Sequence, residues 1–488
     1  MGIVVNQSIR NTVITYIGFA IGAANTLFMY PIFLGKTYYG LTAFLLSSAN
    51  ILMPLMAFGV HNTLVKFYSD YKTEHEKSAF LTFVLLLPLL LILPIAVFGF
   101  LFYDRIAHLL SRENPIIFEY VWLIPVIGLC MGYFEIFYAW VKVHMKSVVG
   151  NFVKEVLLRI LITIFLMLVY YDVLTPIGFV YSTVGIYAAT ALIMMVLAFR
   201  IRMPKFNFDF PQNRSHVMLY SVFIIFSGSV AVLLLDVDKF MLGQYIKIEN
   251  VAYYSVAIFI ATVVSVPSRA MHQITYPITA KLMSENKHDE LNTLYKQTSI
   301  SLQIVGGYVL LGILVNIQSI YELLKPEYRG GIFVVFVIGI SKYFDLILGN
   351  NNAIIFNSKY YKMVLILGLL LAGAAVWLNH LLIPIYMIDG AAVATLIAIT
   401  LYSLAKLMFV VTKMKLFPFT QKTMHCLLIS LLTFALFYYW DFNFHPLVNI
   451  VLKSVLMSVF YAYLNYIFKI SAEVNRVIDS VLAIPPKP

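Results

Sequence analysis

Fourteen stretches of apolar residues follow one another along the chain, separated by short polar segments. About 20 apolar residues are enough for a helix to cross a bilayer, because lipid offers no partners for free backbone polar groups. The pattern therefore predicts an all-α integral membrane protein with fourteen transmembrane helices.

We expect the helices at residues 11–30, 41–65, 79–103, 115–140, 148–171, 175–199, 216–242, 251–277, 292–318, 331–356, 361–383, 388–412, 423–440 and 444–468.

The loops between these stretches differ in charge on the two faces of the membrane. Of the 34 Lys and Arg residues, 22 fall in loops on the side of the N-terminus and 7 in loops on the other side. Lys72 and Lys205 belong to the first group, and Arg105 and Lys325 to the second. Loops rich in Lys and Arg stay in the cytoplasm, so we expect both termini to be cytoplasmic.

The second six predicted helices repeat features of the first six. The segment FLGKTYYGLTAF (33–44) corresponds to MLGQ, a short insert and AYYSVAIF (241–259), and further matches follow at offsets between 208 and 215. These further matches pair Lys66 with Lys281, Glu135 with Asp345, and Gly178 with Gly390. His61 and His272 occupy nearly equivalent stretches of helices two and eight.

The repeat predicts two pseudo-symmetric lobes of six helices each. Because six helices separate the copies, the lobes share one orientation and are related by an axis along the membrane normal, as in transporters whose halves rock about a shared site. We assign residues 1–205 to the N-terminal lobe, 206–415 to the C-terminal lobe, and 416–488 to the last two helices and a cytoplasmic tail.

The composition excludes several classes of protein. The chain is 61% hydrophobic and 12% charged, which rules out a soluble globule. Its net charge of +11 reflects the loop asymmetry and gives no indication of nucleic-acid binding. The first helix is too long for a signal peptide, so we expect it to be retained. No nucleotide-binding loop, nucleophile elbow or zinc spacing occurs, and the two cysteines lie in apolar helices, so we expect no enzyme, cofactor or metal.

Two segments carry a resemblance to a known family. LLLDVDKFMLGQYI followed by VAYYSVAIF (233–259) resembles the start of the second lobe in polysaccharide transporters of the multidrug/oligosaccharidyl-lipid/polysaccharide flippase superfamily. LGKTYYGLTAF and FGVHNTLVKFYSD resemble the counterpart in the first lobe. The resemblance covers nearly the whole chain. It implies a flippase of the bacterial inner membrane that moves undecaprenyl-diphosphate-linked oligosaccharide to the outer leaflet. Membrane lipids and polymer-assembly proteins are the further partners it suggests.

Such a cargo needs cationic groups for its diphosphate and polar groups for its sugars. Arg269 lies deep in predicted helix eight, just after Pro267, and its guanidinium suits phosphate oxygens. A purely structural pairing of Arg269 with a neighbouring helix is the alternative. The other candidate substrate ligands are His272, Gln273, His61, Asn62 and Arg159. For the histidines the alternative is an ordinary interhelical hydrogen bond, and for Arg159 it is a stabilising pair with Glu155.

Other charged residues have candidate roles in entry or coupling. Lys66 and Lys281 lie at the cytoplasmic boundary, where they form either a basic entrance for lipid headgroups or simple snorkelling side chains. Asp345 and Lys342 are three residues apart, which puts both on one helical face, and Glu135 is the repeat counterpart of Asp345. These three are candidates for ion coupling, and an internal ion pair of Asp345 with Lys342 is the alternative.

Two other functions remain open from the sequence. A drug or cation antiporter of the same superfamily usually has twelve helices, so the extra pair argues against it. A membrane glycan polymerase or ligase normally carries a long external loop with catalytic Arg or His, whereas the outer loops here are short.

Overall fold

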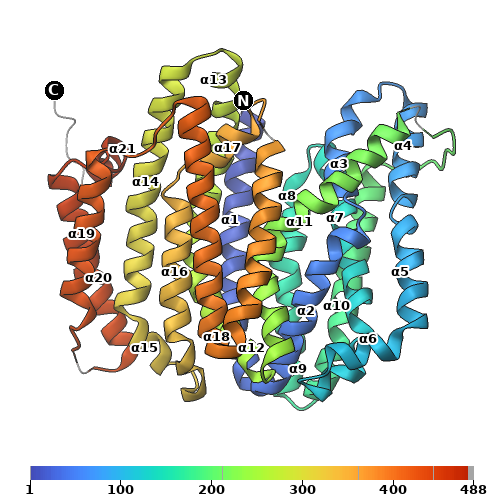
Figure 1. The fold of residues 1–488 in the computed structure, drawn as a ribbon, viewed down its shortest axis with the longest axis horizontal. Coiled ribbons are helices and arrows are strands. Elements are labelled where there is room, and N and C mark those ends of the chain that lie inside the picture. The colour runs from blue at the N-terminus through green and yellow to red at the C-terminus, as the bar shows by residue number, and fades with distance from the viewer. Residues whose placement is uncertain (1, 211–212, 361, 443, 482–488) are drawn as a thin grey trace. The chain divides into compact units, whose positions relative to one another are not determined.

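The computed structural model describes residues 2–210, 213–360, 362–442 and 444–481, which form helices joined by short turns with no strand among them (Figure 1). Within these ranges eight helical runs are long and apolar enough to cross a membrane. Two of the runs, Arg10–Met56 and Lys362–Met414, each contain a break and carry two predicted spans. The chain is therefore an all-helical, multi-pass membrane protein, as predicted. The exact number of fourteen crossings stays a prediction.

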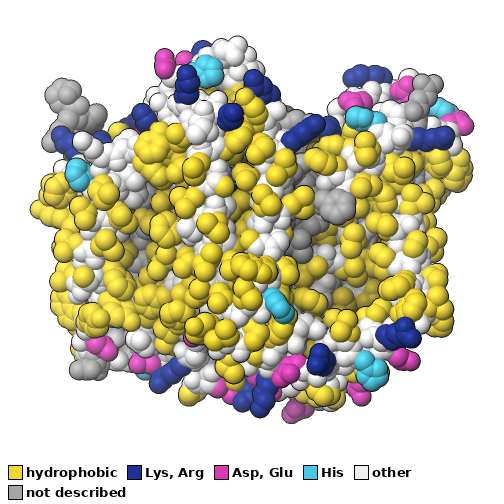
Figure 2. Space-filling view, viewed as in Figure 1, with side chains coloured by type: hydrophobic (Ala, Val, Ile, Leu, Met, Phe, Trp, Pro, Cys, Tyr) yellow, Lys and Arg dark blue, Asp and Glu magenta, His cyan; other side chains and the backbone are white. Residues whose placement is uncertain are grey.

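Apolar side chains cover the middle of the helices on the face that Figure 2 shows, and Lys, Arg, Asp and Glu gather at the helix ends. The chain folds into two compact units, Met1–Ser255 with Ile383–Met387, and Val256–Leu382 with Ile388–Pro488. The division falls inside one helix, α12 (Glu249–Thr262). The lobes inferred from the repeat, 1–205 and 206–415, rest on sequence correspondence and stay a prediction.

The first unit contains the elements up to the start of α12. They are α1 (Gly2–Ala24), the π-helix η1 (Asn25–Leu34), α2 (Gly35–Met56), α3 (Val60–Phe67), η2 (Tyr68–Asp70), α4 (Glu74–Leu86), α5 (Leu89–Leu101), α6 (Tyr103–Leu110), η3 (Pro115–Tyr120), α7 (Leu123–Val143), α8 (Ser147–Phe152), the π-helix η4 (Val153–Leu157), α9 (Leu158–Tyr170), α10 (Pro176–Ile201) and α11 (Arg214–Tyr245).

Two glycines separate consecutive helices in this unit. Gly35, with a φ of +68°, lies between the first predicted span (11–30) and the second (41–65), where η1 ends and α2 begins. Gly59, with a φ of +63°, separates α2 from α3 inside the second predicted span. A Cβ at Gly59 would overlap the backbone carbonyl of Ser221 on α11, so this close approach requires glycine. Helix α7 packs against α2, α3 and α10, and buried Trp140 belongs to this core.

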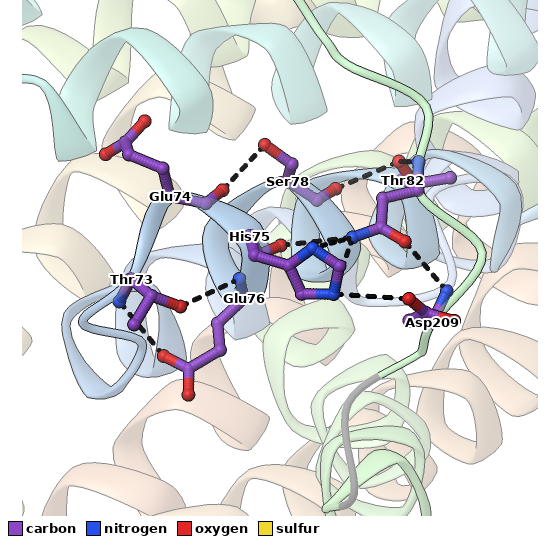
Figure 3. A network of polar contacts seen from close by, with 8 residues as sticks. Thr73, Glu74, His75, Glu76, Ser78, Thr82 and Asp209 are labelled. Carbon is purple, nitrogen blue, oxygen red and sulfur yellow. Dashed lines mark hydrogen bonds and ion pairs between the residues drawn. The ribbon is translucent and has the colours of Figure 1, made fainter.

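The segment that joins α10 to α11 is fastened to α4 (Figure 3). His75 Nε2 lies 3.2 Å from Asp209 Oδ2, and the backbone amide of Asn207 donates to Thr82 Oγ1 at 3.0 Å. Helix α4 begins there with a reciprocal cap, in which Thr73 Oγ1 accepts from the Glu76 amide and the Glu76 carboxylate accepts from the Thr73 amide. These contacts fix the start of α4 and the connecting segment to each other.

The second unit continues from α12. Its elements are η5 (Val263–Ser265), α13 (Val266–Ser284), α14 (His288–Val315), α15 (Ile317–Glu322), η6 (Pro326–Gly331), α16 (Ile332–Leu346), α17 (Asn351–Phe356), α18 (Lys362–Met414), α19 (Gln421–Tyr438), α20 (Pro446–Ile467) and α21 (Ala472–Val481). Met387, with a φ of +53° and a ψ of −129°, breaks α18 between the two spans predicted there.

The last two long helices, α19 and α20, pack beside α14 (Figure 1). A row of polar contacts joins α20 to the end of α14 and to α15, in addition to a buried apolar core. The contacts are Tyr308 OH with Ser458 Oγ at 2.8 Å, Asn316 Nδ2 with Ser454 Oγ at 3.1 Å, and Asn449 Nδ2 with Ser319 Oγ at 3.0 Å. Gln303 of α14 donates to the Thr423 carbonyl of α19 at 3.0 Å.

Candidate functional site

In the first unit a carboxylate of α7 pairs with a lysine of the π-helical turn η4. Lys154 Nζ lies 2.5 Å from Glu135 Oε1. The Glu135 side chain is 17% exposed and that of Lys154 is 42% exposed, so the pair is accessible from one side. Short π-helical segments are rare and frequently occur at functional sites. Here the segment carries the lysine that meets Glu135.

Two lysines lie near one aromatic ring next to this pair. Tyr138 and Lys142 follow Glu135 on α7 at spacings that place all three on one helical face. Lys142 Nζ lies 3.9 Å from the centre of the Tyr138 ring, and Lys154 Nζ lies 5.8 Å from it. Both distances allow cation–π attraction. Gly150 of α8 makes room for the ring, because a Cβ there would overlap it.

The structure adds a predicted substrate ligand to the same place. His61 lies on α3, near enough to Glu135, Lys142 and Lys154 to interact with them electrostatically. Its Nδ1 is buried and has no hydrogen-bond partner among the described residues, while its Nε2 lies 3.2 Å from the amide nitrogen of exposed Asn62. We call the resulting group the first-unit cluster, defined as His61, Glu135, Tyr138, Lys142 and Lys154.

A cavity of about 480 Å³ lies beside this cluster within the first unit. Glu135 and Lys154 contribute to its wall, and so does Asp236 of α11, whose carboxylate lies 3.5 Å from Lys239 Nζ and accepts a hydrogen bond from Asn50. The volume falls within the range of roughly 300–1,000 Å³ typical of small-molecule sites. The remaining lining residues are Asn50, Met53, Met131, Phe134, Leu158, Tyr187 and Thr190.

Arg159 of α9 is held between helices. Its guanidinium pairs with Glu155 at 3.1 Å, the stabilising arrangement that the four-residue spacing predicts. The side chain also packs on α1 at Gly18 and Gly22, where a Cβ would crowd the guanidinium. Asn25 donates to the Arg159 carbonyl at 3.1 Å. These contacts account for Arg159 as a packing residue, and its role toward substrate stays a prediction.

In the second unit Asp345 of α16 pairs with Lys406 of α18. Lys406 Nζ lies 2.9 Å from Asp345 Oδ1 and 3.2 Å from Asn352 Oδ1, and Ser403 Oγ donates to the same carboxylate oxygen at 3.1 Å. The lysine side chain is 1% exposed and that of Asp345 is 44% exposed. Asp345 therefore forms its close ion pair with another helix, and Lys342, the neighbour considered from the sequence, interacts with it electrostatically.

A small polar cavity adjoins this pair. It measures about 40 Å³, which is enough to admit water. His272 of α13 lines it together with Lys342, Asp345 and Lys406. The Nδ1 of His272 is buried without a hydrogen-bond partner among the described residues, and its ring packs edge-on against Tyr276. The other polar lining residues are Ser265, Ser268, Asn351 and Asn352.

The two units thus contain related groups. Each has a histidine from the second helix of the repeat, a carboxylate from the fourth and a lysine from a neighbouring helix: His61, Glu135 and Lys154 in the first unit, and His272, Asp345 and Lys406 in the second. The lysines occupy different helices of the repeat, so only the histidines and carboxylates correspond by sequence position.

Arg269 lies near the start of α13, beyond a local break. The 3₁₀ turn η5 precedes α13, and Pro267 occupies its first turn, so the helix is interrupted where the proline predicts it. The Arg269 side chain is exposed and has no ion-pair partner among the described residues. The side chain of Gln273 lies outside the described part of the structure.

The two lysines at the predicted entrance have ordinary surface contacts. Lys66 is exposed, and its Nζ lies 3.9 Å from the centre of the Tyr220 ring. The Lys281 side chain is 69% exposed, and its Nζ lies 3.8 Å from the Glu285 carboxylate. Both arrangements suit snorkelling side chains, and the entrance role stays a prediction.

Sequence reasoning missed the partners of the two key carboxylates. Lys142 and Lys154 lie near predicted helix ends, where a lysine is typical of the boundary between helix and loop and gives no sign of a site. Lys406 lies inside the predicted helix 388–412, and that position is itself a signal, since such a charge usually has a partner or a cavity. The identity of the partner requires the fold.

Comparison with known proteins decides the family. The sequence profile described as "Polysaccharide biosynthesis protein" matches residues 6–283, which is more than half of the chain. The chain belongs to this family. Comparison with curated protein sequences found no match.

Solved structures share the fold of this polysaccharide biosynthesis family member. The lipid II flippase MurJ, in an inward closed conformation, is 16% identical, with a TM-score of 0.73 over 94% of this chain and 98% of that chain. An inward-facing multidrug resistance MATE family transporter of the MOP superfamily is 14% identical, with a TM-score of 0.62 over 82% and 97%. A MOP superfamily transporter from Pyrococcus furiosus is 13% identical, with a TM-score of 0.58 over 83% and 94%.

Proposed function

We propose that this protein is a flippase that moves undecaprenyl-diphosphate-linked oligosaccharide from the cytoplasmic to the outer leaflet by alternating access. The observation that carries the proposal is the first-unit cluster beside a 480 Å³ cavity, because it sets lysines and polar groups into membrane helices. Charged groups within membrane helices are costly and are retained where they serve a pathway or a partner, and Glu135 and Lys154 both line the cavity. A diphosphate with an attached glycan is a cargo that uses both the cations and the hydroxyl and amide groups.

Family membership supports a lipid-linked glycan over a drug. The matching family is defined by polysaccharide biosynthesis, whereas the likeness to multidrug transporters is one of fold. Within this proposal Arg269, His272, Gln273, His61, Asn62 and Arg159 bind substrate, Lys66 and Lys281 form the cytoplasmic entrance, and Asp345, Lys342 and Glu135 couple an ion. The drug or cation antiporter remains the second candidate, and the shared fold with the MATE transporter favours it.

Reconstitution tests the proposal directly. The purified protein would be placed in liposomes that contain a fluorescent polyprenyl-diphosphate oligosaccharide, and a membrane-impermeant quencher would report the fraction in the outer leaflet. We expect the protein to raise the rate of exchange between leaflets, with no effect on a fluorescent phosphatidylcholine. An unchanged rate for the oligosaccharide lipid, combined with proton- or sodium-driven uptake of a cationic dye, would instead establish the antiporter.

We further propose that the protein resides in a bacterial inner membrane with both termini in the cytoplasm. Single cysteines at positions 105 and 325 should then react with a membrane-impermeant maleimide in intact cells, and cysteines at 72 and 205 should react only after the membrane is opened. The background is a variant in which Cys130 and Cys426 are replaced by serine. Labelling of positions 72 or 205 in intact cells would show the opposite orientation.

A further inference from the structure

The first-unit cluster holds more positive charge than its carboxylate balances. Lys142 and Lys154 both lie near Glu135, and among the described residues Lys142 has no ion-pair partner. The aromatic ring of Tyr138 holds the Lys142 ammonium in place but carries no negative charge. Lys142 is exposed beside the cavity, whereas Lys154 lines it, and the other carboxylate of the cavity wall, Asp236, has its own partner in Lys239. The cluster therefore has the electrostatic requirement of an anion site.

The geometry of the cluster leaves this site accessible. Lys154 is 42% exposed and lines the 480 Å³ cavity, so its ammonium can reach a ligand as well as Glu135. Glu135 Oε1 occupies the position beside Lys154 Nζ that an oxygen of a bound anion would take. Phosphate and carboxylate oxygens accept the same charge-assisted hydrogen bonds from an ammonium group. The buried Nδ1 of His61 is a further polar group at this place that lacks a partner among the described residues.

We propose that the first-unit cluster binds the diphosphate of the lipid carrier, and that Glu135 is a displaceable internal anion that holds Lys154 in place when no ligand is present. Lys142 and Lys154 bind the phosphate oxygens, and Glu135 moves aside when they do. In this inference Glu135 is a counter-ion of the two lysines in place of an ion-coupling residue. The site belongs to the first unit and Arg269 to the second, and the inference rests on the proposed function for the identity of the carrier lipid.

The second unit provides an internal comparison. His272, Asp345 and Lys406 form the related group, but Lys406 is 1% exposed and the adjoining cavity measures about 40 Å³. This space is less than a tenth of the volume of the first-unit cavity. The lysine of the pair is therefore buried in the second unit and accessible in the first, so the anion site is assigned to the first unit alone.

Binding measurements on the full-length protein in phosphatidylcholine nanodiscs test this proposal. Titration calorimetry would use inorganic pyrophosphate and farnesyl diphosphate as probes, with farnesol as the uncharged control. We expect saturable binding of both phosphates and none of farnesol. Binding of farnesol as tight as that of farnesyl diphosphate would assign the affinity to the apolar tail, and binding of pyrophosphate alone would assign the site to a free anion. Either result would overturn the proposal.

Three variants separate an anion site from a structural ion pair. Lys142→Gln removes a cation without breaking an ion pair and should weaken the binding of both phosphates about tenfold, the change that one charge-assisted hydrogen bond represents. Glu135→Gln should strengthen binding by a similar factor, because the competing carboxylate is gone. Lys77→Gln, an exchange in the same unit of a lysine that lies 3.7 Å from Glu74, should leave binding unchanged.

The direction of the Glu135→Gln effect is decisive. If the pair of Glu135 with Lys154 is only structural, this variant leaves phosphate binding unchanged or weaker, and the proposal fails. A Lys77→Gln effect as large as that of Lys142→Gln would show that phosphates respond to overall charge, which also refutes it. Lipid exchange in the liposome assay without saturable phosphate binding would reject this site while the proposed function stands. Phosphate binding without lipid exchange would support this site and reject the proposed function.

Discussion

Replacing Arg269 by alanine is expected to abolish export of the polysaccharide at normal expression. The side chain is exposed on α13 beyond the break at η5, and no ion pair holds it among the described residues. Its loss leaves no carboxylate unpaired there, so the variant should insert and fold. The attraction of a fixed cation for the phosphates of the cargo is lost. The measurement is polymer at the cell surface, normalised to the amount of protein in the membrane.

Two further variants define what the arginine contributes. Arg269→Lys should retain part of the export, because the charge survives while bidentate contact with phosphate does not. Lys66→Ala should have a mild effect if that lysine only snorkels above the Tyr220 ring. Full export by a well-expressed Arg269→Ala variant would show that this residue is not a phosphate ligand.

The exchange Asp345→Asn is expected to destabilise the protein more than Lys406→Met does. Removing the carboxylate leaves the Lys406 ammonium, which is 1% exposed, without its partner, and breaking a buried pair from one side costs about 3–5 kcal/mol. Removing the lysine leaves Asp345, whose side chain is 44% exposed and can be hydrated. Thermal unfolding of the purified variants in one detergent would rank the two effects by the change in Tm.

The double variant Asp345→Asn with Lys406→Met provides the control. It removes both charges, so it should recover most of the stability that Asp345→Asn loses, since replacing a whole buried pair is often nearly neutral. A Tm for Asp345→Asn equal to that of the unchanged protein would mean that the pair does not bear on stability. A double variant no more stable than Asp345→Asn would mean that the carboxylate acts through other contacts, such as that with Ser403.

Hydropathy predicted the long helices well where one apolar stretch forms one helix. The predicted spans 292–318, 423–440 and 444–468 correspond to α14 (His288–Val315), α19 (Gln421–Tyr438) and α20 (Pro446–Ile467). It did not predict the interruptions within stretches, such as the turn at Phe58 and Gly59, both with positive φ. Hydropathy records how well a side chain tolerates lipid, whereas such a break depends on how closely two backbones approach.

The candidate site was predictable residue by residue but not as a set of contacts. His61, Glu135, His272 and Asp345 were all identified from charge and repeat position. Their partners were not, because sequence spacing relates only residues on one helix, and Asp345 meets Lys406 from a helix 61 positions away in the chain. The exposure of Lys154 and the burial of Lys406 depend on the packing around each lysine, which no local pattern records.

The attachment of α19 and α20 to α14 constrains how this lineage can change in length. Gln303, Tyr308 and Asn316 direct polar atoms toward the added pair. Loss of the pair in a single genetic event would leave these atoms facing lipid, where an unpaired polar group costs several kcal/mol. A shorter descendant would therefore require apolar replacements on α14 first. Polar residues on that one helical face are therefore expected wherever the pair is present, and apolar residues where it is absent.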